Sequence, residues 1–212
     1  MSSILKVDEI QDTSGNNIIN ENANTVTIGK SGDTVNVVGT LQNNGSGLVS
    51  GITEADEWRL TSDKTVSNTI SAITTNLART TRAGFSLLGT GMSESSGIFT
   101  FPNTGYWIVG VLNNYTTTDA NRSNAVRLYV TTNNSTYYNI GASGVNVSDD
   151  GGASNSYGAI YSEYLIDVTS TTNVKVKFDT IANNSTMVYN GSTSSTSDGS
   201  STRFMFRRIG DT

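Results

Sequence analysis

The stretch that decides the fold is Gly97–Leu112, with the sequence Gly-Ile-Phe-Thr-Phe-Pro-Asn-Thr-Gly-Tyr-Trp-Ile-Val-Gly-Val-Leu. Its first part, Ile98–Phe101, consists of residues that favour strands. The next segment, Pro102-Asn103-Thr104-Gly105, predicts a turn, because proline fixes φ and glycine adopts turn conformations that other residues resist. Tyr106–Leu112 then continues without a polar residue, which predicts a strand buried on both faces. We therefore place this stretch at the centre of a β-sandwich.

The composition also favours β-structure. Hydrophobic residues make up 35% of the 212 residues and charged residues 15%, while Thr, Ser, Asn and Gly number 31, 28, 24 and 21. So low a charge argues against ordinary disorder, which usually carries a high net charge. Turn-forming residues between short apolar runs predict an all-β fold instead.

Several classes of function are disfavoured by the residue inventory. The net charge of −5 and the pI of about 4.6 disfavour nucleic-acid binding, which needs a basic surface. The chain has no cysteine and no histidine, which removes disulfides, thiolate chemistry and the usual general base. Its start has no apolar core of signal-peptide length, and no apolar run approaches a membrane span. We therefore expect synthesis in a cytoplasm and no membrane insertion.

Further strands are predicted along the chain, and two of them, Val126–Val130 and Val174–Phe178, show alternating apolar positions. The predicted strands are Val126–Val130, Tyr157–Val168, Val174–Phe178 and Phe204–Ile209. In Val174–Phe178 both lysines are expected to point outward, which guards against edge pairing. Eight or more strands in about 130 residues predict a two-sheet jelly roll. Two segments are expected to differ from this pattern. Thr53–Asp56 could cap one helical turn, and Ser67–Thr81 is predicted to be irregular and strand-like.

Residues 1–50 are predicted to form an extended arm, and residues 51–212 the head domain. Val26–Gly29 and Val35–Val38 share a pattern of two short strands, which cannot bury a core alone. Such repeats are usually stacked or wound with identical chains. The alternative is a single hairpin that packs on its own head. Gln42–Gly47 is a linker by composition.

The segment Phe-Thr-Phe-Pro-x-x-Gly-Tyr-Trp, residues 99–107, resembles the signature of C1q/TNF-like jelly-roll heads. The similarity extends upstream to Gly84–Leu88 and downstream to the closing aromatic strand Arg203–Phe206, and covers roughly residues 54–212. The resemblance implies a jelly-roll β-sandwich that forms a homotrimer. Because side chains alternate along a strand, one ring of the Tyr106–Trp107 pair is expected in the core and the other at the trimer interface or second layer. Gly105 is expected at positive φ or beside a close backbone.

The N-terminus carries a second resemblance. Ile4–Ile10, Ser14–Asn16 and Thr25–Gly29 are similar to the start of many tail-fibre and virion structural proteins of marine tailed phages. This implies a non-enzymatic virion protein, assembled in the host cytoplasm, whose arm binds another virion protein through Ile4, Leu5, Val7 and Ile10. Two placements remain open: a short tail fibre or tip that attaches to the host surface, and a capsid decoration or head fibre. A polysaccharide-degrading spike and a soluble carbohydrate-binding module are the rival functions.

Acidic residues are the candidates for chemistry. Asp149-Asp150, and Asp167 with Asp179, could supply the paired carboxylates of a glycosidase, but Asp149–Gly152 has the composition of a solvated loop tip. We therefore expect no catalytic residues and no cofactor. The same loop could hold Ca²⁺, which prefers carboxylate and carbonyl oxygens.

Three long connections are the candidate recognition loops, Tyr115–Arg122, Asp149–Tyr157 and Tyr189–Ser201. Within them Tyr115, Arg122, Tyr157 and Tyr189 are best suited to stack on sugars or anchor a protein surface. The partner is expected to be a host polysaccharide or protein. The alternative is that these rings cover the ends of the sheets.

Overall fold

The computed structural model describes residues 9–11, 13–14, 17–22, 25–28, 31–39, 42–43, 46–47, 51–81, 87–117, 121–147, 155–193 and 201–212. Every regular element in these ranges is a β-strand, which confirms the all-β prediction. In this part of the chain no helix has the length and hydropathy to cross a membrane. The chain divides into two compact units, Met1–Ser50 and Gly51–Thr212, which are described separately below.

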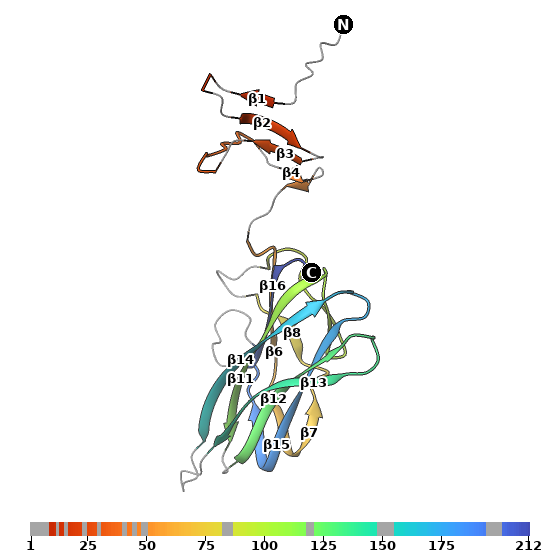
Figure 1. Cartoon of the computed structure of the whole chain (residues 1–212). Coiled ribbons are helices and arrows are strands. Elements are labelled where there is room, and N and C mark those ends of the chain that lie inside the picture. The colour runs from red at the N-terminus through yellow and green to blue at the C-terminus, as the bar shows by residue number, and fades with distance from the viewer. Residues whose placement is uncertain are drawn as a thin grey trace. The chain divides into compact units, whose positions relative to one another are not determined.

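The first unit contains short antiparallel strands (Figure 1). β1 (Glu9–Gln11), β2 (Asn17–Asn22) and β3 (Thr25–Ile28) form one sheet in sequence order, and β4 (Gln42–Asn43) pairs with β5 (Ser46–Gly47). The strand predicted around Val26 is therefore present. The strand predicted at Val35–Val38 is wrong, because these residues form no strand and lie exposed. Gly32 and Gly39, both at positive φ, turn the backbone on either side of this segment.

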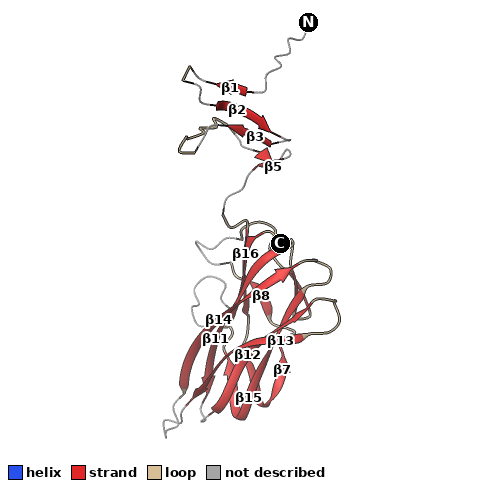
Figure 2. Cartoon of the chain, viewed as in Figure 1, coloured by secondary structure: helices blue, strands red, loops and turns tan. Residues whose placement is uncertain are grey.

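The second unit is a sandwich of two antiparallel layers, called the first and second sheet below, which the pairing of β11 with β15 joins into one continuous sheet (Figure 2). The first sheet has the order β14–β11–β16–β6–β8, with the bounds Ser156–Val168, Gly105–Thr117, Arg203–Gly210, Glu54–Leu60 and Leu77–Arg79. The second has the order β13–β12–β15–β7, with the bounds Tyr138–Val147, Asn121–Thr131, Lys175–Tyr189 and Lys64–Ala72. β10 (Ile98–Thr100) pairs with β15 and with β9 (Ser93–Ser95). These strands confirm the predicted jelly roll.

β11 occupies the centre of the first sheet, between β14 and β16. Trp107 is fully buried, whereas Tyr106 keeps 39% of its surface exposed, so the two rings lie on opposite faces as predicted. The prediction that this strand is buried on both faces is wrong, because its outward-facing residues are only partly buried. Gly105 has φ 132°, and a Cβ there would lie 2.3 Å from the carbonyl oxygen of Gly210. Both reasons for a glycine at this position are therefore present.

Aromatic rings from four strands fill the space between the sheets. Phe99 is fully buried and makes an edge contact with Trp58, at a centroid distance of 5.4 Å. Its ring also packs on Phe178 and Phe206, at 5.7 and 5.1 Å. Such pairs contribute about 0.5–1.5 kcal/mol each beyond the area they bury. The stretch chosen from the sequence therefore supplies the centre of the core.

The helical turn predicted at Thr53–Asp56 is wrong, because β6 begins at Glu54. Its two carboxylates accept hydrogen bonds from a distant loop instead. Glu54 accepts the backbone N–H groups of Thr90 and Gly91 at 2.8 and 2.9 Å. Asp56 accepts the backbone N–H of Met92 at 2.8 Å and two N–H groups of Arg79. Buried carboxylates satisfied in this way hold the loop against the strand.

Two other predicted segments are more regular than expected. The segment predicted to be irregular between Ser67 and Thr81 contains most of β7 and all of β8. β15 extends from Lys175 to Tyr189 and pairs with strands on both sides. Lys175 and Lys177 therefore do not guard a sheet edge, because β15 is an interior strand.

The strand ends that flank the three predicted recognition loops lie at one end of the sandwich, whereas residues 118–120, 148–154 and 194–200 of these connections lie outside the described residues. Thr117 pairs with Ser156, Asn121 pairs with Val147, and Tyr115 pairs with Tyr189. The connections that follow β11, β13 and β15 therefore share this end, which we call the loop end. The chain enters the head at Gly51, directly before β6, whose first residue pairs with Arg208 near the far end of β16. Gly51 thus lies at the end opposite the loop end.

Candidate interaction surfaces

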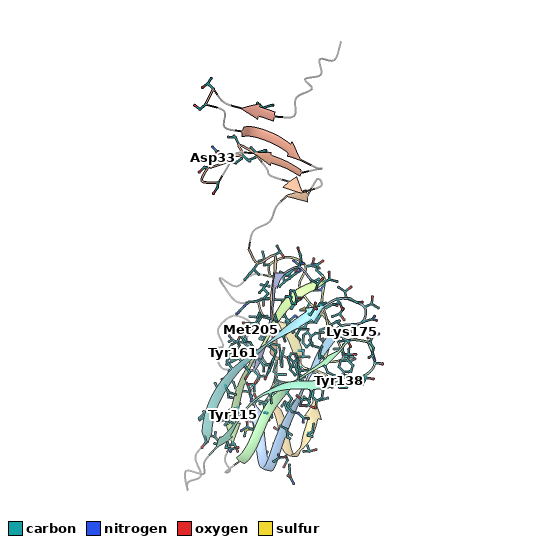
Figure 3. The ribbon with its side chains drawn as sticks, in the orientation of Figure 1. Asp33, Tyr115, Tyr138, Tyr161, Lys175 and Met205 are labelled. Carbon is teal, nitrogen blue, oxygen red and sulfur yellow. The ribbon has the colours of Figure 1, made fainter. Side chains whose placement is uncertain are left out.

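Apolar side chains gather on the outer face of the first sheet, the side turned away from the core. Along β14 exposed and more buried residues alternate, and Tyr161 and Leu165 keep 45% and 61% of their surface exposed. Leu112 and Ile108 of β11 are their register partners. We call the following set the apolar face: Tyr106, Ile108, Leu112, Tyr161, Leu165, Met205 and Ile209. Tyr161 and Met205 are labelled in Figure 3.

Tyr161 lies across the sheet because β11 has a glycine beside it. A Cβ at Gly110 would lie 2.6 Å from the Tyr161 hydroxyl, so any larger residue would displace the ring. The hydroxyl donates a hydrogen bond to Glu163 Oε2 at 2.8 Å. Burial raises the pKa of Tyr161, and the hydrogen bond to Glu163 raises it further. The ring therefore stays neutral at ordinary pH and covers the middle of the apolar face.

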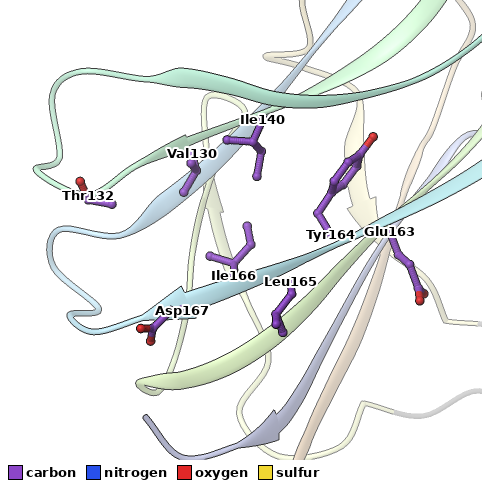
Figure 4. A pocket seen from close by; sticks show the side chains of 8 residues that line it. All are labelled: Val130, Thr132, Ile140, Glu163, Tyr164, Leu165, Ile166 and Asp167. Carbon is purple, nitrogen blue, oxygen red and sulfur yellow. The ribbon is translucent and has the colours of Figure 1, made fainter.

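A pocket of about 520 Å³ opens between β14 and the β12–β13 hairpin (Figure 4). It is lined by Val130, Thr132, Ile140, Glu163, Tyr164, Leu165, Ile166 and Asp167. Side chains bridge the two edge strands beside it: Tyr164 donates to the carbonyl of Ala142, and Ser143 donates to that of Ile160, both at 3.0 Å. Leu165 belongs to the pocket and to the apolar face. The two surfaces are therefore continuous.

Tyr115 and Tyr189 do not lie at the surface. Both rings belong to the core, with 5% and 0% of their surface exposed, and both residues lie in strands. The hydroxyl of Tyr189 donates to the carbonyls of Ala125, at 3.1 Å, and Ile181, and burial raises its pKa. The expectation that these two rings are available for recognition is wrong, because the inward side of each strand carries them into the sandwich.

The other two candidate recognition residues are Tyr157 and Arg122. Tyr157 is the second residue of β14, at the loop end, and its ring is 73% exposed. Its hydroxyl accepts a hydrogen bond from Asn155 Nδ2 at 3.3 Å. Arg122 lies in β12, beside Asn121; its side chain is outside the described residues. Tyr157 is therefore the candidate whose ring the structure places at the surface.

A polar pocket of about 490 Å³ also lies at the loop end, lined by Thr61, Ser62, Asp63, Gly191, Ser192 and Thr193. Asp63 accepts a hydrogen bond from the backbone N–H of Gly191 at 2.8 Å. Arg59 donates to the carbonyl of Ser192 from behind the pocket. Hydroxyl and amide groups of this kind suit contact with polar molecules such as sugars. Gly191, Ser192 and Thr193 of the predicted loop Tyr189–Ser201 are therefore part of a polar surface.

The attachment residues of the arm are only partly described. Ile4, Leu5 and Val7 lie outside the described residues, and Ile10 lies in β1 with a partly exposed side chain. Further apolar side chains in this unit are exposed, namely Ile28, Val35, Val37 and Val38. Exposed apolar residues gathered in a small unit indicate a contact surface.

The candidate carboxylate pairs do not converge. Asp149 and Asp150, the possible Ca²⁺ ligands, lie outside the described residues. On the second sheet, Asp179 accepts hydrogen bonds from the Nε and Nη2 atoms of Arg127 at 2.7 and 2.6 Å. Asp167 is instead exposed on β14 of the first sheet. The pairing of Asp167 with Asp179 is therefore wrong. Among the residues that the structure describes, no three His, Cys, Asp or Glu side chains gather as metal ligands.

The apolar face was missed in the sequence, although part of its signal was present. In Tyr157–Val168 every second residue, including Tyr161 and Leu165, belongs to one face. This alternation could have shown that the strand carries apolar residues on both faces. The contribution of Met205 and Ile209 had no such signal, because it depends on the pairing of β16 with β11.

Comparisons with known proteins bear on the fold. The sequence matches no protein-family model and no curated protein. Among solved structures it is similar to Eiger TNF from S. frugiperda, with a TM-score of 0.54 and 10% identity over 74% of this chain and 93% of that chain. Murine APRIL at pH 8.5 (TM-score 0.48, 10% identity, 74% and 98% covered) and the PRD1 vertex protein P5 (0.47, 11%, 76% and 100%) are further matches. The head of this protein thus has the TNF-like jelly-roll fold.

Proposed function

We propose that this protein is a non-enzymatic structural component of a tailed-phage virion, a short tail fibre or tip that assembles as a homotrimer. In this proposal the N-terminal arm binds another virion protein and the loop end of the head contacts the host surface. The observation that carries the proposal is the apolar face, which leaves Tyr161 and Leu165 largely exposed on a rigid sheet. On this face exposed apolar side chains lie among the charged residues Glu163, Asp167 and Arg207, a mixture that suits a contact with another protein.

The partner that suits this face is a second copy of the chain. The apolar face lies on the outer side of β14, β11 and β16, whereas the pocket beside it lies between β14 and the β12–β13 hairpin. A contact between two different surfaces of identical chains is head-to-tail, and a rotation that closes it generates a ring. The resemblance to C1q/TNF-like heads implies a ring of three. Leu165 is 61% exposed, so its full burial in this ring would contribute roughly 1–2 kcal/mol.

The arm supports attachment to a particle. Its strands are two to six residues long, and it exposes Ile28, Val35 and Val38. Strands this short gain stability when they pack with other chains. The head begins at Gly51, at its end opposite the loop end, so an attachment through residues 1–50 requires no residue of the loop end. Tyr157 and the polar pocket at that end would remain accessible to the host surface.

Sedimentation of the full chain tests the assembly. We expect a species with three times the 22.5 kDa mass of one chain at micromolar concentration. Leu165→Glu, which places a charge in the apolar face, is expected to shift this species toward the monomer. Tyr157→Ser, on the same strand but at the loop end, is the control and should leave it unchanged. A stable monomer of the unsubstituted chain would refute the trimer.

Labelling in the virion tests the placement. A tag at the C-terminus of the chain, imaged in whole particles at low resolution, is expected to appear at the tail tip. Density on the capsid shell would overturn the tail placement in favour of a capsid decoration or head fibre. Hydrolysis of host polysaccharide by the purified trimer would overturn the non-enzymatic assignment.

A further inference from the structure

The outer face of the second sheet carries cations stacked on tyrosine rings. The ammonium of Lys177 lies 4.2 Å from the ring centre of Tyr137 and 5.9 Å from that of Tyr129. The guanidinium of Arg127 lies 5.4 Å from the Tyr129 ring. Lys175 lies two residues before Lys177 on the same strand, labelled in Figure 3. We call Arg127, Tyr129, Tyr137, Lys175 and Lys177 the cation–tyrosine strip.

The charges of this strip are only partly neutralised. Arg127 makes a bidentate ion pair with Asp179. Within the described residues, this is the only ion pair that a residue of the strip makes. The rings that hold Lys177 carry no formal charge, so they position its ammonium without cancelling it. The strip therefore presents two uncompensated positive charges on a chain whose net charge is −5.

The strip is also held in place. β15 is an interior strand, paired with β12 along the segment that contains Lys175 and Lys177 and with β10 on the other side. Residues two apart on a strand point to the same face and are separated by about 7 Å. The Tyr129–Lys177 register pair fixes the tyrosine beside the cation. The backbone positions of the two lysines are thus fixed, and the ammonium of Lys177 is held over its two rings.

We infer that the cation–tyrosine strip binds an anionic polysaccharide, a glycan that carries carboxylate or sulfate groups. Lysine ammonium groups bind such anions by charge-assisted hydrogen bonds, and the tyrosine hydroxyls can exchange hydrogen bonds with sugar hydroxyls. A nucleic acid fits less well, because its binding depends on many phosphate contacts from a basic surface, whereas the strip offers only the two lysines outside the Arg127–Asp179 ion pair. The strip is separate from the loop end, so its failure would leave the proposed function standing.

A binding assay with defined polymers tests this inference. The full chain is titrated at low ionic strength with polygalacturonate, dextran sulfate, neutral dextran and duplex DNA. We expect binding to the two anionic glycans that weakens as salt screens the charges, and no binding to neutral dextran. The relative affinity for polygalacturonate and dextran sulfate distinguishes a carboxylate from a sulfate ligand. Binding to DNA as tight as to both glycans would overturn the inference.

Matched substitutions locate the site. Replacement of Lys175 and Lys177 by Met keeps most of each stem and removes the charge, and is expected to lower the affinity about tenfold. Lys64→Met, near the other end of β15 in register with Tyr189, is the control and should leave affinity unchanged. Tyr137→Leu removes the ring that holds Lys177 and is expected to cause a smaller loss. Melting curves of each variant separate loss of binding from loss of fold. Equal affinity in the folded double variant and the parent would refute the site.

Discussion

Trp107→Ala tests the central claim about the core. The Trp107 ring is fully buried and packs on Phe101 at a centroid distance of 5.1 Å. Its Nε1 donates a hydrogen bond to the carbonyl of Asn103 at 3.1 Å, so the ring also ties β11 to the proline turn. Truncation of such a ring lowers the free energy of unfolding by about 3–5 kcal/mol, through lost burial and the cavity that remains.

The size of the head converts this loss into a melting temperature. For a domain of about 150–250 residues, 1 kcal/mol shifts the midpoint by roughly 2–4 °C, so Trp107→Ala should melt about 6–20 °C below the parent. Thermal and urea unfolding followed by circular dichroism measure the change, at one fixed protein concentration because assembly adds stability. Tyr157→Ala, an exposed ring on β14, is the control and should change stability by less than about 0.5 kcal/mol. A loss below about 1 kcal/mol for Trp107→Ala would show that its ring is not part of a closed core.

The remaining predictions concern the turn, the acidic loop, the arm and alkaline pH. Gly105→Val should destabilise the head more than its added volume suggests, since φ is 132° and its Cβ would meet the Gly210 carbonyl at 2.3 Å; a melting temperature equal to the parent would contradict this. Asp149→Ala and Asp150→Ala should leave melting and assembly unchanged, and a variant that melts low or needs Ca²⁺ would identify a structural metal site. Deletion of residues 1–50 should leave a folded head that no longer joins the particle, which quantification of copy number in purified virions checks. The folded-state pKa of Tyr189 is raised above the ordinary value of 10.0, so its contribution to stability is present below pH 10 and is lost as pH rises toward the folded pKa. Urea unfolding across pH 8–12 should therefore show a decline above about pH 10 that is smaller in Tyr189→Phe.

Much of the head could be predicted from local sequence. The turn at Pro102–Gly105 and the strand after it follow from the backbone restrictions of proline and glycine, which need no distant partner. The strands around Val126 and Val174 follow from alternation, because side chains of a strand point to opposite faces. These local signals, with the motif at residues 99–107, were sufficient to predict the jelly roll.

The sites were less predictable, because accessibility depends on which face of a strand is covered. Tyr115 and Tyr157 both lie near the ends of long strands, yet one ring is buried and the other exposed. The difference is that Tyr115 is on the inward side of β11 and packs against Gly158, where a Cβ would lie 2.1 Å from its hydroxyl. No local pattern distinguishes these two tyrosines. The pairing of β11 with β14 decides it.

By itself, then, the sequence determined the class of fold, the position of its central strand and the low charge that limits its partners, since each depends on composition or on neighbours in the chain. The tertiary structure decided what strand pairing brings together from distant segments. Glu54 and Asp56 were expected in a helical turn, but backbone N–H groups more than thirty residues away satisfy their carboxylates within a strand. Tyr161 covers the apolar face because the register places it beside Gly110, and Lys177 stands over two tyrosines because β15 pairs with β12. Contacts of this kind depend on register, which only the folded arrangement of the sheets specifies.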